Sequence, residues 1–180
     1  FEQKNIVKDF SIKVIRGNRI GIVGPNGAGK TTLIKLLTKK LAPDEGFVRI
    51  GKNLQEAYFD QNRFSLNLQK TLWQTLCDEG DHLWVRGSFR HVVAYLKDFL
   101  FTPEQAKSPV ATLSGGEKNR LMLAKILSQP SNFLLLDEPT NDLDMDTLDL
   151  LQEMLSEYDG TMIVVSHDRD FLDKLVTSII

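Results

Sequence analysis

The apolar positions of the chain divide into short continuous runs and longer stretches with helical spacing. Three continuous runs are typical of buried strands: 19–23, 133–136 and 161–165. Four stretches have apolar residues at helical spacing: 30–41, 116–128, 146–158 and 169–175. Strands that alternate with helices predict an α/β fold, in which a mainly parallel sheet is covered by helices on both faces. Residues 178–180 resemble the start of one more strand.

Before residue 61 the pattern is less regular. Residues 6–15 alternate loosely between apolar and polar positions and predict an early strand. Two short apolar runs, 47–50 and 54–59, are separated by a turn signal and predict a hairpin.

Between residues 62 and 112 the pattern of apolar and polar residues changes. Helical spacing predicts helices at 66–76 and 91–100, and the polar segment 78–88 predicts a loop between them. We therefore expect one domain, in which 62–112 is a helical insert and the flanking parts, 1–61 and 113–180, form the α/β core.

The turn after the first continuous run is rich in glycine. It reads G-x-x-x-x-G-K-T and consists of Gly24, Pro25, Asn26, Gly27, Ala28, Gly29, Lys30 and Thr31. A strand that turns through glycines into a helix directs several backbone N–H groups and the positive end of the helix dipole at one point, which suits a phosphate chain. Lys30 adds a cation for the β- and γ-phosphates, the Thr31 hydroxyl can ligate Mg²⁺, and Thr32 adjoins them. The motif predicts nucleotide binding.

Two carboxylates follow the run 133–136. In the second half of a nucleotide site, Asp137 would hold the Mg²⁺. Glu138 would face the γ-phosphate as a general base or as the group that positions the attacking water. An acidic loop after a strand is the alternative interpretation, which the phosphate-binding turn elsewhere in the chain disfavours.

The segment 113–117 reads L-S-G-G-E and opens a predicted helix. Ser114 and Glu117 have the spacing of a capping box, which is the structural interpretation. The double glycine, Gly115 and Gly116, is more than a cap needs. It favours a second anion-binding site built from backbone N–H groups at a helix start.

Two further polar residues follow predicted strands. His167 comes after the run 161–165, and we expect it to contact the γ-phosphate, although a lone histidine is more often structural. Gln61 comes after the run 54–59, where its amide could reach Mg²⁺ or the attacking water. Gln61 carries no meaning without the other motifs.

The composition sets limits on the function. With 180 residues, 42% of them hydrophobic, the chain can build one domain with a substantial core. A net charge of -2 provides no global basic field for nucleic acid, and no apolar run has the length of a membrane span. The single cysteine, Cys77, excludes an internal disulfide and suits a cytoplasmic protein. The chain starts without Met and stops in a strand-like run, so we expect a fragment of a longer protein.

In this order the motifs resemble those of the ATP-binding cassette (ABC) superfamily. The resemblance extends over nearly the whole chain: the glycine-rich turn matches Walker A, Gln61 the Q-loop, 113–117 the LSGGE signature, 133–138 Walker B with its catalytic glutamate, 141–144 the D-loop and His167 the switch histidine. It implies a P-loop, RecA-like core, a small antiparallel β subdomain and an α-helical subdomain at the insert. It also implies that Phe1 stacks on adenine and that Asp144 belongs to the nucleotide site.

Some segments narrow the resemblance. Residues 138–144 and 166–173 resemble the ABC-F branch, which carries two cassettes on one chain and no membrane domain, and residues 90–101 resemble the second cassette of Uup-type proteins. In this superfamily two cassettes close head to tail over two ATP molecules. The resemblance therefore implies that Ser114, Gly115 and Gly116 serve the partner's nucleotide, and that the isolated chain binds ATP but hydrolyses it weakly.

The expected function is that of a soluble ABC-F ATPase cassette that acts on the ribosome or translation, with nucleic-acid contacts made by segments outside this chain. One alternative is the nucleotide-binding subunit of a membrane ABC transporter, which would need a groove near Gln61 and the insert for its transmembrane partner. Another is a chromosome- or repair-related binding module, in which the nucleotide switches the conformation.

Overall fold

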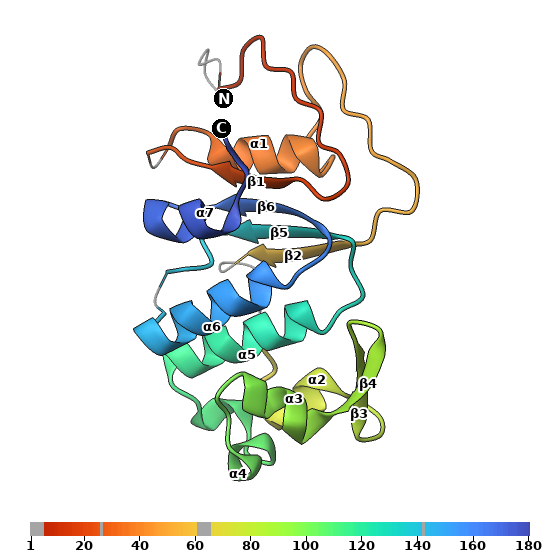
Figure 1. Ribbon diagram of the computed structural model, residues 1–180, viewed down its shortest axis with the longest axis vertical. Helices are drawn as coiled ribbons and strands as arrows, with labels where there is room; N and C mark the ends of the chain where they lie inside the picture. The colour runs from red at the N-terminus through yellow and green to blue at the C-terminus, as the bar shows by residue number, and fades with distance from the viewer. Residues whose placement is uncertain (1–5, 26, 61–65, 142) are drawn as a thin grey trace.

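The structure is a computed structural model that describes residues 6–25, 27–60, 66–141 and 143–180 (Figure 1). Its centre is a five-stranded sheet with the order β2-β5-β6-β1-β7. Its strands are β1 Arg19–Ile22, β2 Glu56–Asp60, β5 Phe133–Asp137, β6 Thr161–Val165 and β7 Ser178–Ile179. All neighbouring strands of this sheet run parallel, as the alternation of strand and helix patterns predicted.

The two faces of the sheet are covered by different helices. On one face Ile20, Ile22 and Val165 pack against Ile34 of α1 (Lys30–Leu37). On the other face alternate residues of the same strands, such as Val164, belong to a larger core with α5 (Gly115–Leu127), α6 (Met145–Ser156) and α7 (Arg169–Leu175). The α/β fold class is thus confirmed, and α1 and α5 lie on opposite faces.

Residues 66–112 occupy the end of the molecule away from α1 and β7 (Figure 1). They contain the following elements: α2 Leu72–Leu76, β3 His82–Val85, β4 Ser88–His91, α3 Val92–Asp98, α4 Pro103–Ala106 and the short 3₁₀ turn η1 Val110–Thr112. Tyr95 and Leu96 of α3 are buried in the same core as α5, and the Tyr95 hydroxyl donates a hydrogen bond to the carbonyl oxygen of Ala124 at 2.8 Å. The insert is therefore packed on the sheet domain through α5.

The predicted loop at 78–88 is wrong, because β3 and β4 form an antiparallel hairpin there. Leu83 and Val85 are buried while the residues between them face outward, which is the alternation of a half-buried strand. Arg86 and Gly87 have φ values of 49° and 80° and make the tight turn. The polar composition of 78–81 concealed this short alternating pattern.

Two predicted strands near the N-terminus are also wrong. Residues 6–15 and 47–50 are not strands, and β2, from the run predicted at 54–59, pairs in parallel with β5 instead of forming a hairpin. Phe10 is 39% exposed and Phe47 is 75% exposed, so these segments lack the buried face that makes a two-stranded pair stable. The small antiparallel sheet of this fold is β3–β4.

Two helices are shorter than predicted. The helix predicted at 66–76 begins only at Leu72, because the backbone before it pairs with the segment 108–111 instead: Val110 N–H donates to the Lys70 carbonyl at 2.9 Å, and Thr71 then caps α2. The first helix, predicted at 30–41, ends at Leu37 with Thr38 as its C-cap.

Candidate nucleotide site

Three neighbouring strands bring the predicted site residues to one edge of the sheet. β1 leads into the glycine-rich turn and Lys30, β5 leads into Glu138, and β6 leads into His167. Because the carboxyl ends of parallel strands meet at the same edge, residues far apart in sequence become neighbours there. This is the edge at which open α/β sheets bind ligands.

Lys30, Glu138 and His167 form a compact charged cluster. Lys30 Nζ lies 3.0 Å from His167 Nε2 and 3.7 Å from Glu138 Oε1. His167 Nε2 is 3.0 Å from the same Glu138 oxygen, and the His167 backbone N–H donates to Glu138 Oε2 at 3.3 Å. The Lys30 and Glu138 side chains are only 11% and 18% exposed, so their charges are partly shielded from solvent.

The glycine-rich turn closes around the Lys30 ammonium. Lys30 Nζ donates to the carbonyl oxygen of Gly24 at 2.6 Å and, more weakly, to that of Pro25 at 3.4 Å. Gly27 and Gly29 have φ values of 78° and 101°, a region that residues with a Cβ rarely adopt. A phosphate group at this turn would exchange the two carbonyl contacts of Lys30 for oxygen atoms of the ligand.

The N-terminus of α1 is built to receive an anion. Gly29 is its N-cap, and within the described chain no side chain caps this end of the helix. The first N–H groups of a helix have no partner inside the helix, and they carry partial positive charge. Lys30 opens the helix, and Thr31 and Thr32 follow in its first turn, with Thr31 exposed. A phosphate chain fits this end of α1 in both charge and hydrogen bonding.

Glu138 is held in an uncommon backbone conformation. Its φ of 51° lies in the left-handed region, and its N–H donates to the Val165 carbonyl at 2.8 Å. Such a conformation in a residue other than glycine costs of the order of 1 kcal/mol and persists where the surroundings impose it. Here it turns the carboxylate toward Lys30 and His167.

Two further carboxylates, Asp60 and Asp137, lie near Glu138 at this edge of the sheet. Asp60, at the end of β2, is paired in register with Asp137 of β5 and is 8% exposed. The Tyr58 hydroxyl donates to Asp60 Oδ2 at 3.3 Å. Burial raises the pKa of Asp137, and the charges of Asp60 and Glu138 raise it further. The sequence analysis did not identify Asp60 as a site residue. The available signal was its position at the end of a predicted strand, directly before Gln61.

The oxygen donors at this edge suit Mg²⁺. Carboxylate and hydroxyl oxygens are its preferred ligands, and a cation would relieve the repulsion between the neighbouring carboxylates. Among the residues that the structure describes, no three His, Cys, Asp or Glu side chains form a ready metal cluster. Of the predicted ligands, Asp137 ends β5 at this edge and Thr31 lies in the first turn of α1; they would hold the ion together with phosphate oxygens, as Mg²⁺ commonly binds in nucleotide sites.

The signature segment does not join this cluster. Ser114 is the N-cap of α5, on the face of the sheet opposite α1, and makes the full capping box with Glu117. Ser114 N–H donates to Glu117 Oε2 at 2.8 Å, and Glu117 N–H donates to Ser114 Oγ at 3.3 Å. Ser114 and Gly115 are exposed, with Gly116 half-buried behind them. The cap and the exposure leave this segment accessible to a second molecule.

The remaining predicted residues fall into two groups. Asp144 is the N-cap of α6, where its Oδ1 accepts a hydrogen bond from the Thr147 N–H at 2.8 Å. Hydrogen bonding to Thr147, through its side chain first and its backbone N–H second, lowers the pKa of Asp144. Phe1, Asn26 and Gln61 lie outside the described residues.

Comparisons with known proteins agree with this arrangement. A family model described as ABC transporter matches residues 7–141. ATP-binding protein Uup of Caulobacter vibrioides is 54% identical over 100% of this chain, which spans 30% of that protein. The energy-dependent translational throttle protein EttA of Mycobacterium tuberculosis is 41% identical over 100% of this chain, which spans 32% of it.

Solved structures agree as well. An archaeal ribosome recycling factor, solved in complex with a ribosomal stalk protein, superposes with a TM-score of 0.73 at 29% identity, covering 92% of this chain and 32% of that one. Within the described residues, no helix combines the length and the apolar character needed to cross a membrane. The chain spans 30% and 32% of the length of these two relatives, so it corresponds to one part of such proteins.

Proposed function

Because this chain belongs to the ABC transporter family of ATP-binding cassette proteins, we propose that it binds ATP with Mg²⁺ and hydrolyses ATP to ADP and phosphate. Members of this family are ATPases in general. The observation that carries the proposal is the cluster of Lys30, Glu138 and His167 beside the N-terminus of α1, with separations of 3.0 to 3.7 Å.

Each residue of the cluster has a separate role in the proposal. Lys30 leaves the carbonyl oxygens of its own turn and binds the γ-phosphate. Glu138 accepts the proton of the attacking water on its buried Oε1, and His167 contacts the γ-phosphate and orients that carboxylate through its backbone N–H. Mg²⁺, held by Asp137 and Thr31 with help from Gln61, would neutralise charge on the phosphate oxygens.

We propose that the exposed signature segment completes the site of a second cassette. Ser114 is the N-cap of α5 and Gly115 its first residue; both are exposed, and α5 lies on the face opposite α1, so they are poorly placed to serve the chain's own nucleotide. Two cassettes closing head to tail would bring Ser114, Gly115 and Gly116, and also Asp144, to the nucleotide of the partner. Phe1 would stack on the adenine. Because the site would then be shared, the isolated chain should hydrolyse ATP only weakly.

For the longer protein we propose an ABC-F type role, in which closure of two cassettes acts on the ribosome or on translation in the cytoplasm. The support is the 41% identity to a protein named a translational throttle and the structural likeness to a ribosome recycling factor. Co-sedimentation of the full-length protein with ribosomes, with and without ATP, tests this role. Absence of ATP-dependent ribosome binding, together with copurification of a membrane subunit, would favour the transporter alternative.

The ATPase assignment is tested with Glu138→Gln. Removing the carboxylate should lower the rate of phosphate release about 10²- to 10⁴-fold while ATP binding persists. The exposed helix residue Glu153 provides a matched control, because Glu153→Gln makes the same chemical change outside the site and should leave the rate within about two-fold. Hydrolysis by Glu138→Gln at the rate of the unchanged protein would reject the role of Glu138.

A further inference from the structure

Two helix N-termini, those of α4 and α5, are joined by one glutamine side chain. α4 begins with a capping box, in which the Thr102 N–H donates to Gln105 Oε1 at 2.9 Å and the Gln105 N–H donates to Thr102 Oγ1 at 3.2 Å. The other end of the same amide reaches α5, because Gln105 Nε2 donates to Glu117 Oε1 at 2.8 Å. Glu117 belongs to the capping box of α5, so the two boxes are linked.

The link continues to the signature segment. The second carboxylate oxygen of Glu117, Oε2, accepts the Ser114 N–H. One chain of hydrogen bonds therefore runs from the Thr102 N–H through the amide of Gln105 and the carboxylate of Glu117 to the backbone of Ser114. Turning the Gln105 amide over would place donor against donor and carbonyl against carboxylate, so this chain fixes a single arrangement.

A second contact joins the same two segments one helical turn further along α5. The Arg120 guanidinium lies over the ring of Phe101, 5.3 Å from its centroid. Phe101 directly precedes Thr102 and is 2% exposed, so its ring belongs to the core. Glu117 and Arg120 are three residues apart and share one face of α5. The start of this helix is thus held against the segment 101–105 at two points.

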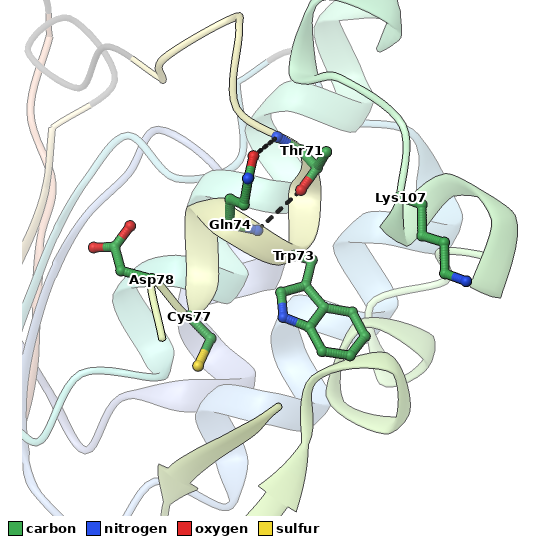
Figure 2. A pocket seen from close by; sticks show the side chains of 6 residues that line it. All are labelled: Thr71, Trp73, Gln74, Cys77, Asp78 and Lys107. Carbon is green, nitrogen blue, oxygen red and sulfur yellow. Dashed lines mark hydrogen bonds between the residues drawn. The ribbon is translucent and has the colours of Figure 1, made fainter. Parts of the chain in front are cut away.

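The start of α2 shows that a capping box does not require such a link. Thr71 and Gln74 make the same pair of hydrogen bonds there, at 3.0 and 3.1 Å, beside an open hollow of the insert (Figure 2). Gln74 is exposed, and within the described part of the chain its side chain makes no hydrogen bond beyond this box. Capping alone therefore does not explain why the Gln105 amide also reaches α5.

We propose that Gln105 is a positioning residue for the shared nucleotide site: through Glu117 it fixes the orientation of the signature segment, which meets the nucleotide of a second cassette. This inference rests on the proposed function, in which the signature segment serves the partner. Ser114 and Gly115 are exposed, so packing in the core does not hold them. Groups that complete a site act only when neighbouring residues keep them in the productive geometry. Gln105 provides this support by fastening the signature segment to the insert.

The variant Gln105→Glu disrupts the link and keeps the cap of α4. One oxygen of the new carboxylate still accepts the Thr102 N–H, while the other faces Glu117 Oε1, and two carboxylates at this distance repel each other. The double variant Gln105→Glu/Glu117→Gln restores the link with donor and acceptor exchanged. In that variant the new amide donates to the new carboxylate, and its carbonyl oxygen accepts the Ser114 N–H.

The test measures ATP hydrolysis per molecule of the chain as a function of chain concentration, at saturating ATP. A site shared between two copies makes this rate rise with concentration, because the copies must associate. Gln105→Glu should raise the concentration that gives a half-maximal rate about 3- to 10-fold, the effect of one lost hydrogen bond at the contact. The double variant should return this concentration to within about two-fold of that of the unchanged chain.

Gln74→Glu is the matched control, because it makes the same chemical change in the same kind of capping box without a link to a second helix. It should leave the half-maximal concentration within about two-fold. ATP affinity, titrated at a chain concentration too low for association, should also stay within about two-fold in Gln105→Glu, since α5 lies on the face opposite α1. A loss of ATP affinity in Gln105→Glu would indicate a general disturbance of the fold and overturn the positioning role.

The outcomes separate this inference from the proposed function on which it rests. The positioning role is overturned if the unchanged chain shows the concentration dependence and Gln105→Glu behaves like Gln74→Glu. It is also overturned if the double variant is no better than Gln105→Glu. A rate per molecule that stays constant with concentration in the unchanged chain rejects the shared site itself.

Discussion

Two helices of this chain begin at glycines, and their first turns are completed in different ways. α1 starts from Gly29, whose φ is 101° and which caps the helix without a side chain. α5 starts from the capping box of Ser114 and Glu117 and has Gly115 as its first residue. The left-handed backbone conformation at Gly29 favours glycine, while Gly115 lies in ordinary helical conformation.

The space around the two glycines also differs, because Gly29 is crowded and Gly115 is not. A Cβ on Gly29 would come within 2.1 Å of Ile6 Cγ2, whereas a Cβ on Gly115 would meet no atom within 4 Å. At Gly29 the start of α1 is thus closely approached by another segment of its own chain. The start of α5 satisfies its own hydrogen bonds and keeps an empty surface, which is what a contact with a second molecule needs.

The largest expected effect lies at α1. Lys30→Ala should weaken ATP binding about 30-fold, because it removes a charge-assisted contact worth about 2 kcal/mol. Isothermal titration with ATP measures the loss. Lys52→Ala, which removes the same charge from an exposed loop, should leave the affinity within about two-fold. Equal affinities of the two variants would refute the role of Lys30.

The glycines themselves give the most direct comparison. Gly29→Ala should lower the free energy of unfolding by about 1–2 kcal/mol, the cost of a left-handed conformation for a residue with a Cβ. It should also weaken ATP binding, because the turn must shift. Gly115→Ala should change the unfolding free energy by less than about 0.5 kcal/mol, since its Cβ meets open space. Urea unfolding of both variants tests the contrast, and equal losses would contradict it.

An intermediate effect is expected from Ser114→Ala. Loss of the N-cap should lower the free energy of unfolding by about 1 kcal/mol, as for other caps. ATP affinity of the isolated chain should not change, since the α5 start lies on the face opposite α1. Chemical denaturation and ATP titration of the same variant separate the two effects. An ATP affinity as low as that of Lys30→Ala would show that the signature serves its own nucleotide.

The smallest effect concerns the pH dependence of the α5 cap. Hydrogen bonds from Ser114 hold the pKa of Glu117 below its usual value. A lowered pKa means that the ionised carboxylate stabilises the folded state above its ordinary pKa, and that this stabilisation is lost as the pH falls through the lowered value. The unfolding free energy of Glu117→Gln, which keeps the cap geometry without the charge, should therefore approach that of the unchanged protein as the pH falls below about 5 and through the lowered pKa. A gap that widens on acidification would refute this account.

Local patterns predicted the elements nearest the nucleotide cluster well. β6 and α7 have the predicted bounds, 161–165 and 169–175, because a fully apolar run and a helix with an aspartate N-cap are both encoded within a few residues. Lys30, Glu138 and His167 could be proposed for one site because each lies in the segment that comes after a strand: Lys30 at the end of the glycine-rich turn after β1, and Glu138 and His167 within two residues of β5 and β6. Their mutual distances required the parallel order of β5, β6 and β1.

Other features could not be read from local patterns. The hairpin β3–β4 was missed because four-residue strands with histidine, tryptophan and arginine resemble a loop in composition. Asp60 was missed because its significance comes from register: β2 pairs with β5, which brings Asp60 level with Asp137. In both cases the decisive neighbour is distant along the chain.

The sequence by itself determined the order of the motifs, the parallel α/β class and the chemistry available at the turn 24–31, since glycine, lysine and carboxylate spacing are local properties. The tertiary structure decided which of these groups meet. It joined Lys30, Glu138 and His167, and it left Ser114 and Gly115 on the opposite face. The physical reason is that strand order and helix packing are set by burial over the whole core, which no short segment contains.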